Sequence, residues 1–467
     1  MVRTPPSQML QTKFIQSVEI GGSPRFDPGW AHHPNFESRL SLRGCNSRTE
    51  MTEDRGFESL GSACDMMRTK FVYASRCIRE EYPKRTLSSL FNAFGGINTL
   101  LHDGRRVLVK PNVNFPTRES GVNTNPAIIE SLIQLLMDSG VDEVAIGEGS
   151  GIESDTSRIF KATGYDEIAE KTGARLIDFD SSEKVKLEVP NGLALKDLEI
   201  PKPLLDYDVL INVPLAKTSI CTTVTLCLKN LMGILSKRYK VKAHLSGLSQ
   251  AIVDIHKAVK PELNILDATV GMEGFGPISG TPKRTNWILM SRSAVELDSV
   301  AAKLMGIEPS DIEHLKRASE QGLGTIEASE IDLSGIDLEK DSVRFTVPSS
   351  TPSVAEGVRL ILGETCRNCI GPYNVAIFRI DKNGKLPDLK GLEILMGKRA
   401  KPSGKVTRTL AIGNCSKPIR DKVDCYVAGC PPPGILIGDS IKVLCGIEKE
   451  PTRYMRRWYE LMKQIAS

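Results

Sequence analysis

Arg106-Val-Leu-Val-Lys-Pro-Asn-Val-Asn114 decides the fold, because a short apolar strand runs directly into a lysine, a proline and two asparagines. A predicted helix then begins at Asn125-Pro126, since asparagine caps helix N-termini and proline fits the first turn. It stays apolar along one face and ends near Gly140. A strand, a polar loop and a covering helix form the unit from which α/β folds are built.

The same alternation of strand and helix continues from Lys70 to about Gly324. Short, fully apolar strands between helices are typical of a parallel sheet that is covered on both faces. The sequence therefore predicts an α/β fold with a mostly parallel sheet and helices on both faces. Further strands are expected at residues 144–146, 175–178, 208–213, 263–266 and 287–290, and helices at 166–172, 225–235, 248–259 and 295–305.

Six of the eleven cysteines lie in the last quarter of the chain. Cys366 and Cys369 are three residues apart, as on a tight turn that holds a metal centre from two sides, and we expect Cys415 and Cys430 to complete the ligand set from separate loops. Zinc modules usually contain two such short pairs, whereas single ligands in separate loops favour an iron–sulfur cluster. We therefore predict a 4Fe-4S cluster, with zinc as the alternative cofactor.

The remaining cysteines and histidines are weaker candidates for metal binding. Cys221, Cys227 and Cys445 lie in apolar stretches and are expected to be small buried hydrophobic residues. Cys425 fits either a spare ligand or a core residue of a strand. His244 and His256 are expected to be ordinary helix or core histidines, with His244 placed in a loop as the better candidate for chemistry. No metal role is expected for the pair His32-His33 or for Cys45 and Cys64.

Composition and periodicity divide the chain into four parts. Residues 1–66 show no sustained periodicity and are expected to be a disordered extension or a misassigned start, with the true start at Met66 or Met67. Residues 67–324 form the α/β domain, and the polar residues 325–350 form a connection or a small strand pair. Residues 351–467 form a smaller, cysteine-bearing α+β domain, with strands expected at 375–378 and 409–412 and a docked amphipathic helix at 452–466.

The overall charge argues against a nucleic-acid partner. The chain has 61 basic and 57 acidic residues among 467, a net charge of +4, and only 5% aromatic residues. A broad basic surface and a supply of stacking rings are therefore both absent. No apolar run is long enough to span a bilayer, and the N-terminus does not resemble a signal peptide. We expect a cytoplasmic protein without membrane contact.

Polar residues follow the predicted strands where ligands bind in an open parallel sheet, outside the carboxyl ends of the strands. A lysine suits a carboxylate or a phosphate, and a nearby carboxylate can act as a general base or a magnesium ligand. Residues Gly147-Glu-Gly-Ser-Gly151 lack a complete nucleotide-binding pattern, and the glycine-rich residues 271–280 fit either a lid or a packed loop. The catalytic candidates are Lys110, Lys217, Lys229 and Glu273, and the substrate-binding candidates are Asn112, Asn114, Thr218, Asn230 and Asp267.

Several of these motifs occur in an order that resembles a known family. Val107-Leu-Val-Lys-Pro-Asn112, Asn123-Thr-Asn-Pro126, Asn212-Val-Pro-Leu-Ala-Lys-Thr218, Leu228-Lys-Asn-Leu-Met-Gly233, Gly271-Met-Glu-Gly-Phe-Gly-Pro277 and Asp298 are similar to the domain of unknown function 362 family, often labelled uncharacterised iron–sulfur centre proteins. The resemblance covers about residues 70–324 and implies an α/β fold and iron–sulfur binding, but no assigned reaction. The C-terminal cysteine pattern resembles the tail of some members. The bacterial ferredoxin run of other members is absent, which puts a two-cluster relay in doubt.

Three functions compete on this evidence. The first is a redox-linked enzyme or assembly factor that binds a small anionic molecule through Lys110, Asn112, Lys217 and Lys229, with the cluster over the crevice and a redox protein as a further partner. The second is a non-enzymatic protein whose C-terminal domain is stapled by a structural cluster or zinc. The third is a nucleic-acid module with a zinc ribbon, which the charge balance disfavours.

Overall fold

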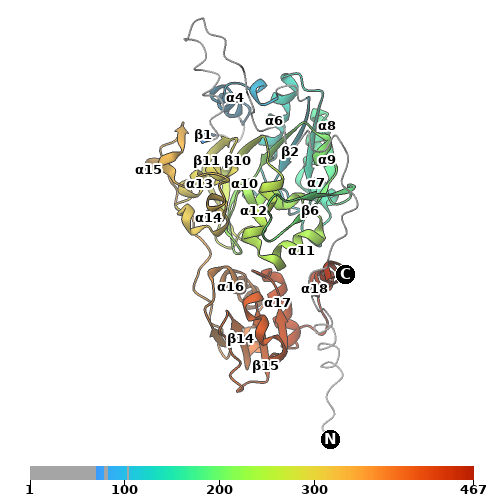
Figure 1. Ribbon diagram of the computed structural model, residues 1–467, viewed down its shortest axis with the longest axis vertical. Helices are drawn as coiled ribbons and strands as arrows, with labels where there is room; N and C mark the ends of the chain where they lie inside the picture. Colours follow the sequence, from blue (N-terminus) through green and yellow to red (C-terminus); the bar gives the residue numbers. More distant parts are fainter. Residues whose placement is uncertain (1–69, 78–82, 102–104, 467) are drawn as a thin grey trace, which may run out of the picture.

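The computed structural model describes residues 70–77, 83–101 and 105–466. Its first 69 residues, on which the expectations for residues 1–66 fall, lie outside the described residues. Two lobes stack along the long axis of the molecule, with the large N-terminal lobe above the smaller C-terminal lobe in Figure 1. The C-terminal helix α18 (Arg453–Ala466) lies beside the junction between them.

The large lobe is built around a mostly parallel sheet, as predicted. Its main path has the strand order β12-β1-β11-β10-β7-β2-β3-β4, in which β12 is Asp332–Ser334. The parallel centre consists of β7 (Val209–Val213), β2 (Arg106–Pro111), β3 (Glu143–Glu148) and β4 (Arg175–Asp178). The long hairpin of β10 (Leu263–Glu273) and β11 (Thr281–Ser291) is antiparallel, and β1 (Phe71–Arg76) pairs antiparallel with β11. A side pair, β8 (Leu215–Ser219) and β9 (Thr223–Thr225), joins the sheet through β10.

Helices cover both faces of this sheet because successive strand residues point to opposite sides. Val107 and Val109 of β2 belong to one hydrophobic core, and Leu108 between them belongs to the other. The first core includes residues of α4 (Pro83–Phe94), α6 (Pro126–Asp138), α7 (Thr156–Thr163) and α8 (Tyr165–Thr172). The second includes residues of α10 (Cys227–Asn230), α12 (Leu248–Ala258), α13 (Ala294–Leu304) and α14 (Glu313–Glu320).

Three local expectations for the large lobe need correction. Residues 225–235 are not one helix, because Thr225 ends β9 and only the short α10 and a 3-10 turn, Leu231–Ile234, follow. The carboxylate of Asp298 accepts hydrogen bonds from the backbone N–H groups of Cys227 and Leu228, which fixes where α10 begins. His244 lies in helix α11 (Lys237–Ser246), not in a loop. Residues 325–350 include β12 (Asp332–Ser334), which extends the large sheet by pairing with β1.

The C-terminal lobe has a parallel sheet of its own, in the order β13 (Arg359–Leu362), β14 (Leu392–Met396), β15 (Arg408–Ile412), β16 (Cys425–Val427). The smaller domain, expected to be α+β, therefore has an α/β arrangement, because its strands pair in parallel. The strand expected at residues 375–378 was wrong, because these residues lie in helix α16 (Arg367–Lys382), which packs against α17 (Gly434–Leu444). A run of four apolar residues does not distinguish a strand from a buried helix.

Helix α18 joins the two lobes. It contacts α11 of the large lobe and α17 of the small one, and the side chain of Trp458 is fully buried. The expectation of an amphipathic helix docked on the protein is confirmed. Within the described part of the chain, no helix is both long and apolar enough to cross a membrane.

Candidate functional site

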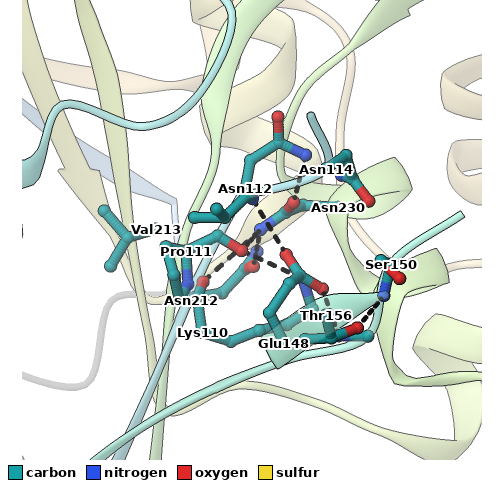
Figure 2. Close-up of polar contacts among 12 residues, drawn as sticks. Lys110, Pro111, Asn112, Asn114, Glu148, Ser150, Thr156, Asn212, Val213 and Asn230 are labelled. Atoms are coloured by element: carbon teal, nitrogen blue, oxygen red, sulfur yellow. Dashed lines mark hydrogen bonds and ion pairs between the residues drawn. The ribbon is translucent and has the colours of Figure 1, made fainter. Parts of the chain in front are cut away.

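The carboxyl ends of β2 and β3 carry a buried ion pair. Lys110 Nζ lies 2.9 Å from the Glu148 carboxylate, and both side chains are completely buried. Glu148, which Figure 2 draws beside Lys110, also accepts hydrogen bonds from the backbone N–H groups of Val113 and Gly149. Burial lowers the pKa of Lys110, and the adjacent carboxylate opposes that shift. Both charges are therefore satisfied within the protein.

A chain of asparagine amides runs beside this ion pair. Asn112 Nδ2 donates to Asn230 Oδ1 at 3.0 Å, Asn230 Nδ2 donates to Asn212 Oδ1 at 2.8 Å, and Asn212 Nδ2 donates to Asn264 Oδ1 at 2.9 Å. All four residues are buried (Figure 2 draws the first three). Each amide both accepts and donates, so the chain ties β2, α10, β7 and β10 together.

Lys217, on β8, stands at the start of this chain. Its Nζ donates to Asn112 Oδ1 at 2.6 Å and also to the Val122 carbonyl. Burial lowers the pKa of Lys217 to about 7, and the positive charge of Lys229 adds to that effect. Lys217 is thus a buried amine that titrates near neutral pH. Four of the nine predicted α/β site residues, Lys110, Asn112, Lys217 and Asn230, fall within this one network.

Lys229 lies at the edge of the network and points elsewhere. Its half-buried side chain donates from Nζ to Ser219 Oγ at 2.8 Å. Burial lowers the pKa of Lys229 to about 8. Ser219 ends strand β8, at the mouth of the hairpin with β9, where the large lobe meets the small one. Lys229 is therefore the predicted lysine nearest to the junction of the lobes.

The other predicted residues are engaged in local hydrogen bonds. Asp267 accepts from the backbone N–H of Asn125 and from Thr269, and Thr218 Oγ1 donates to the Gly274 carbonyl at 2.9 Å. Glu273 accepts from the backbone N–H of Thr346 at 2.8 Å and lies 3.6 Å from Lys283 Nζ, outside the asparagine chain. The backbone N–H of Asn114 donates to the Asn123 side chain. These contacts hold the loops around the network.

The four predicted ligand cysteines lie at one edge of the second sheet. Cys366 follows β13 and caps α16, Cys369 lies in the first turn of that helix, Cys415 follows β15, and Cys430 follows β16. The carboxyl ends of parallel strands share one edge, which explains how three distant loops meet. Cys366 and Cys430 are exposed to solvent, and Cys369 and Cys415 are partly exposed.

The four thiols influence one another electrostatically. A hydrogen bond from Cys369 lowers the pKa of Cys366 to about 6, with backbone N–H groups of the first turn of α16 helping. The same bond, burial and the charges of Cys366, Cys430 and Cys415 raise the pKa of Cys369. Among the described residues, no three His, Cys, Asp or Glu side chains are grouped as around a metal ion. Cys425 is buried in the core of the small lobe, away from this edge.

The cysteine edge faces the large lobe. The backbone N–H of Cys430 donates to the His244 carbonyl at 2.7 Å, and the backbone N–H of Leu248 donates to the Cys430 carbonyl at 2.8 Å. Asn414 Nδ2 donates to the Leu245 carbonyl at 2.6 Å. The turn between α11 and α12 is thus bonded to the loops that carry Cys415 and Cys430. His244 contacts the Pro431 carbonyl, and burial lowers its pKa to about 4.

Sequence reasoning missed several polar residues of this region. Asn212 sits in a strand that is otherwise apolar, which was the available signal for it, whereas Asn264 lies in β10, which carries several polar residues. Lys240 of α11 is buried and donates to the carbonyls of Gly149 and Ser150, and burial lowers its pKa to about 8. Ser219 gave no signal, because one serine at a strand end is common.

Comparison with known proteins assigns the centre of the large lobe to a family. Residues 107–303 match the family model described as "Domain of unknown function (DUF362)". The segment is named the DUF362 domain here after the family model that it matches. It contains the Lys110–Glu148 pair, the asparagine chain and Lys229, whereas all four cysteines lie beyond it. The resemblance inferred from the sequence motifs is therefore confirmed.

Two similar proteins provide further comparison. A thylakoid-associated protein of Synechocystis is 26% identical to this chain over 252 residues, which cover 51% of this chain and 74% of the relative. The solved lactate racemase apoprotein of Thermoanaerobacterium thermosaccharolyticum covers 86% of this chain and 82% of its own, at 13% identity and a TM-score of 0.39. At that score, the likeness carries no statement about the DUF362 domain's activity.

Proposed function

We propose that this protein binds a 4Fe-4S cluster through Cys366, Cys369, Cys415 and Cys430 and acts as a redox-linked enzyme on a small anionic substrate. The observation that carries the proposal is the position of these four thiols at one sheet edge that is bonded to the DUF362 domain. Thiolates are the ligands of such clusters.

The chemistry of the four loops suits such a group. An added Cβ at Gly413 would lie 3.1 Å from Cys369 Sγ, so a glycine there leaves room beside a candidate ligand. Pro431, Pro432 and Pro433 follow Cys430. Proline lacks a backbone donor, and its ring fixes the φ angle, so the loop after Cys430 is stiff. A bound cluster would supply one-electron transfer at the junction of the lobes.

The residues of the DUF362 domain would bind and hold a proton rather than carry electrons. Lys229, with a pKa of about 8, exchanges a proton readily near neutral pH and reaches Ser219 at the junction. Lys217 and the asparagine chain lie behind it and fix the loops at the carboxyl ends of β2, β7 and β8. A small anion at this junction would meet positive charge.

A structural role for the same cluster is the second candidate. The loops that carry Cys415 and Cys430 are bonded to the turn between α11 and α12, so a metal centre there would also hold the lobes together. In that case, removing the metal would loosen the junction, and the metal centre would take no part in electron transfer.

Cysteine substitutions test the proposal. Cys366→Ser and Cys415→Ser, prepared anaerobically, should each lose the broad visible absorption of thiolate-bound iron, whereas Cys425→Ser, a change in the core, should keep it. Unchanged absorption in the first two variants would reject the ligand assignment. Limited proteolysis of the same variants separates the two roles, because a purely structural centre predicts cleavage at the junction as its main effect.

A further inference from the structure

A polar groove lies between the DUF362 domain and the cysteine edge. It is lined from the large lobe by Ser219 and Thr223, from the connection by Ser349 and Ser350, and from α16 by Arg367 and Asn368. The groove is small and open to solvent on one side. Its walls meet closely beneath, since a Cβ added at Gly371 of α16 would lie 2.2 Å from the Ile220 carbonyl oxygen.

Arg367 is the one charged residue among the nine that line this groove. None of the nine residues that line it is an aspartate or a glutamate. Arg367 is exposed, and no carboxylate partner for it occurs among the residues that the structure describes. Lys229 contributes a second positive charge from behind, through its hydrogen bond to Ser219 Oγ. A planar guanidinium with free donors matches the oxygens of a carboxylate or a phosphate.

The backbone of the groove is strained at one of its hydroxyl residues. Thr223 has a φ of +67°, although a branched side chain disfavours this region strongly. Strained residues that persist in a fold often lie at binding sites, where the surrounding structure holds them in place. The strain therefore points to a use for the threonine side chain that glycine would not provide.

We infer that this groove binds a small oxyanion, a carboxylate or a phosphate group, between Arg367 and the hydroxyls of Ser219 and Thr223. The anion would lie one hydrogen bond from Lys229 and next to Cys366, the residue that precedes Arg367. The site deepens the proposed function, on which its redox role rests, by naming a place and a chemical class for the substrate. Binding of the anion itself does not require the cluster.

Calorimetric titration of the full chain with inorganic phosphate, and separately with malonate, tests the inference. The wild type should bind at least one probe, and Arg367→Gln should weaken that binding about tenfold or more, because a charge-assisted contact is lost. Lys382→Gln removes a charge from the far end of the same helix and should leave binding unchanged. The inference would be overturned if the wild type bound neither probe, or if Arg367→Gln bound the probe as tightly as Lys382→Gln.

Thr223→Gly separates a binding role from a folding role. Glycine accepts the positive φ, so the melting temperature should stay equal or rise while binding of the preferred probe weakens. Unchanged binding in this variant would remove Thr223 from the site and contradict the inference as stated. Visible absorption and iron content are recorded on the same samples. Arg367-dependent binding in a chain without iron would keep this inference and reject the proposed function. Iron in a chain that shows no Arg367-dependent binding would reject this inference and keep the proposed cluster.

Discussion

Lys217 Nζ donates to Asn112 Oδ1 across 2.6 Å, and both side chains are almost completely buried. The contact links a lysine with a pKa of about 7 to a chain of asparagine amides that crosses the carboxyl ends of the parallel strands. An amide accepts a hydrogen bond from an ammonium group without neutralising it, so burial dominates the titration of this lysine.

Asn112→Ala should destabilise the protein by about 1–3 kcal/mol, because it leaves Lys217 and Asn230 each without one buried partner. Urea denaturation monitored by circular dichroism measures the loss. Asn92→Ala, on the exposed side of α4, is the matched control and should change stability by less than about 0.5 kcal/mol. Equal effects of the two substitutions would show that the buried asparagine chain adds no more to the free energy of unfolding than an exposed asparagine does.

Stability should depend on pH through Lys217. Its pKa is about 7 in the folded chain, against about 10.4 for an ordinary lysine. Between these values the unfolded chain binds more protons, so stability rises as the pH increases from about 7 to 10 and falls as it returns. Lys217→Met cannot titrate and should make this rise in the free energy of unfolding less steep, measured at several pH values, while Lys229 and Lys240 still contribute to it. A slope as steep as that of the wild type would contradict the assigned pKa.

Gly233→Ala should disrupt the buried ion pair. A Cβ at this position would lie 2.0 Å from Glu148 Oε1 and 2.7 Å from Lys110 Nζ, so the two charges cannot keep their places. Disturbing a buried pair costs several kcal/mol, on the order of 3. Gly438→Ala, inside α17, meets its nearest neighbour at 3.6 Å and should be neutral or slightly stabilising. Thermal unfolding of both variants checks the opposite signs.

Lys229 should be unusually reactive toward acylating reagents. With a pKa of about 8, about a quarter of its amines are neutral at pH 7.5, against about a thousandth for an ordinary lysine. Brief treatment with an N-hydroxysuccinimide ester, followed by peptide mass spectrometry, should label it faster than the exposed Lys382. Slower labelling than Lys382 would mean that burial shields the amine more than its lowered pKa activates it.

Much of the fold could be predicted because its strands are short, apolar and bounded by polar loops. The apolar run ending at Val109 predicts a strand, and the apolar periodicity after the Asn125 cap predicts a helix. The structure contains both elements. Residues 375–378 were wrongly predicted as a strand, because a buried helix and a buried strand are equally apolar over four residues. The break after Thr225 depends on Asp298, a distant residue that caps α10 through space.

The candidate site was predictable only in part. Strand ends indicated Lys110, Asn112 and Lys217 correctly as neighbours, since the carboxyl ends of parallel strands meet at one edge. The groove beside Arg367 could not be found in this way, because it forms where two lobes meet and its residues are ordinary serines and threonines. Contacts between lobes produce no periodic pattern of apolar residues in the sequence of either lobe.

Iron and acid-labile sulfide in anaerobically purified protein test the central claim most directly. The account predicts about four of each per chain, and a loss of both in Cys366→Ser. One zinc ion per chain without sulfide, or no metal bound to a folded chain, would contradict it.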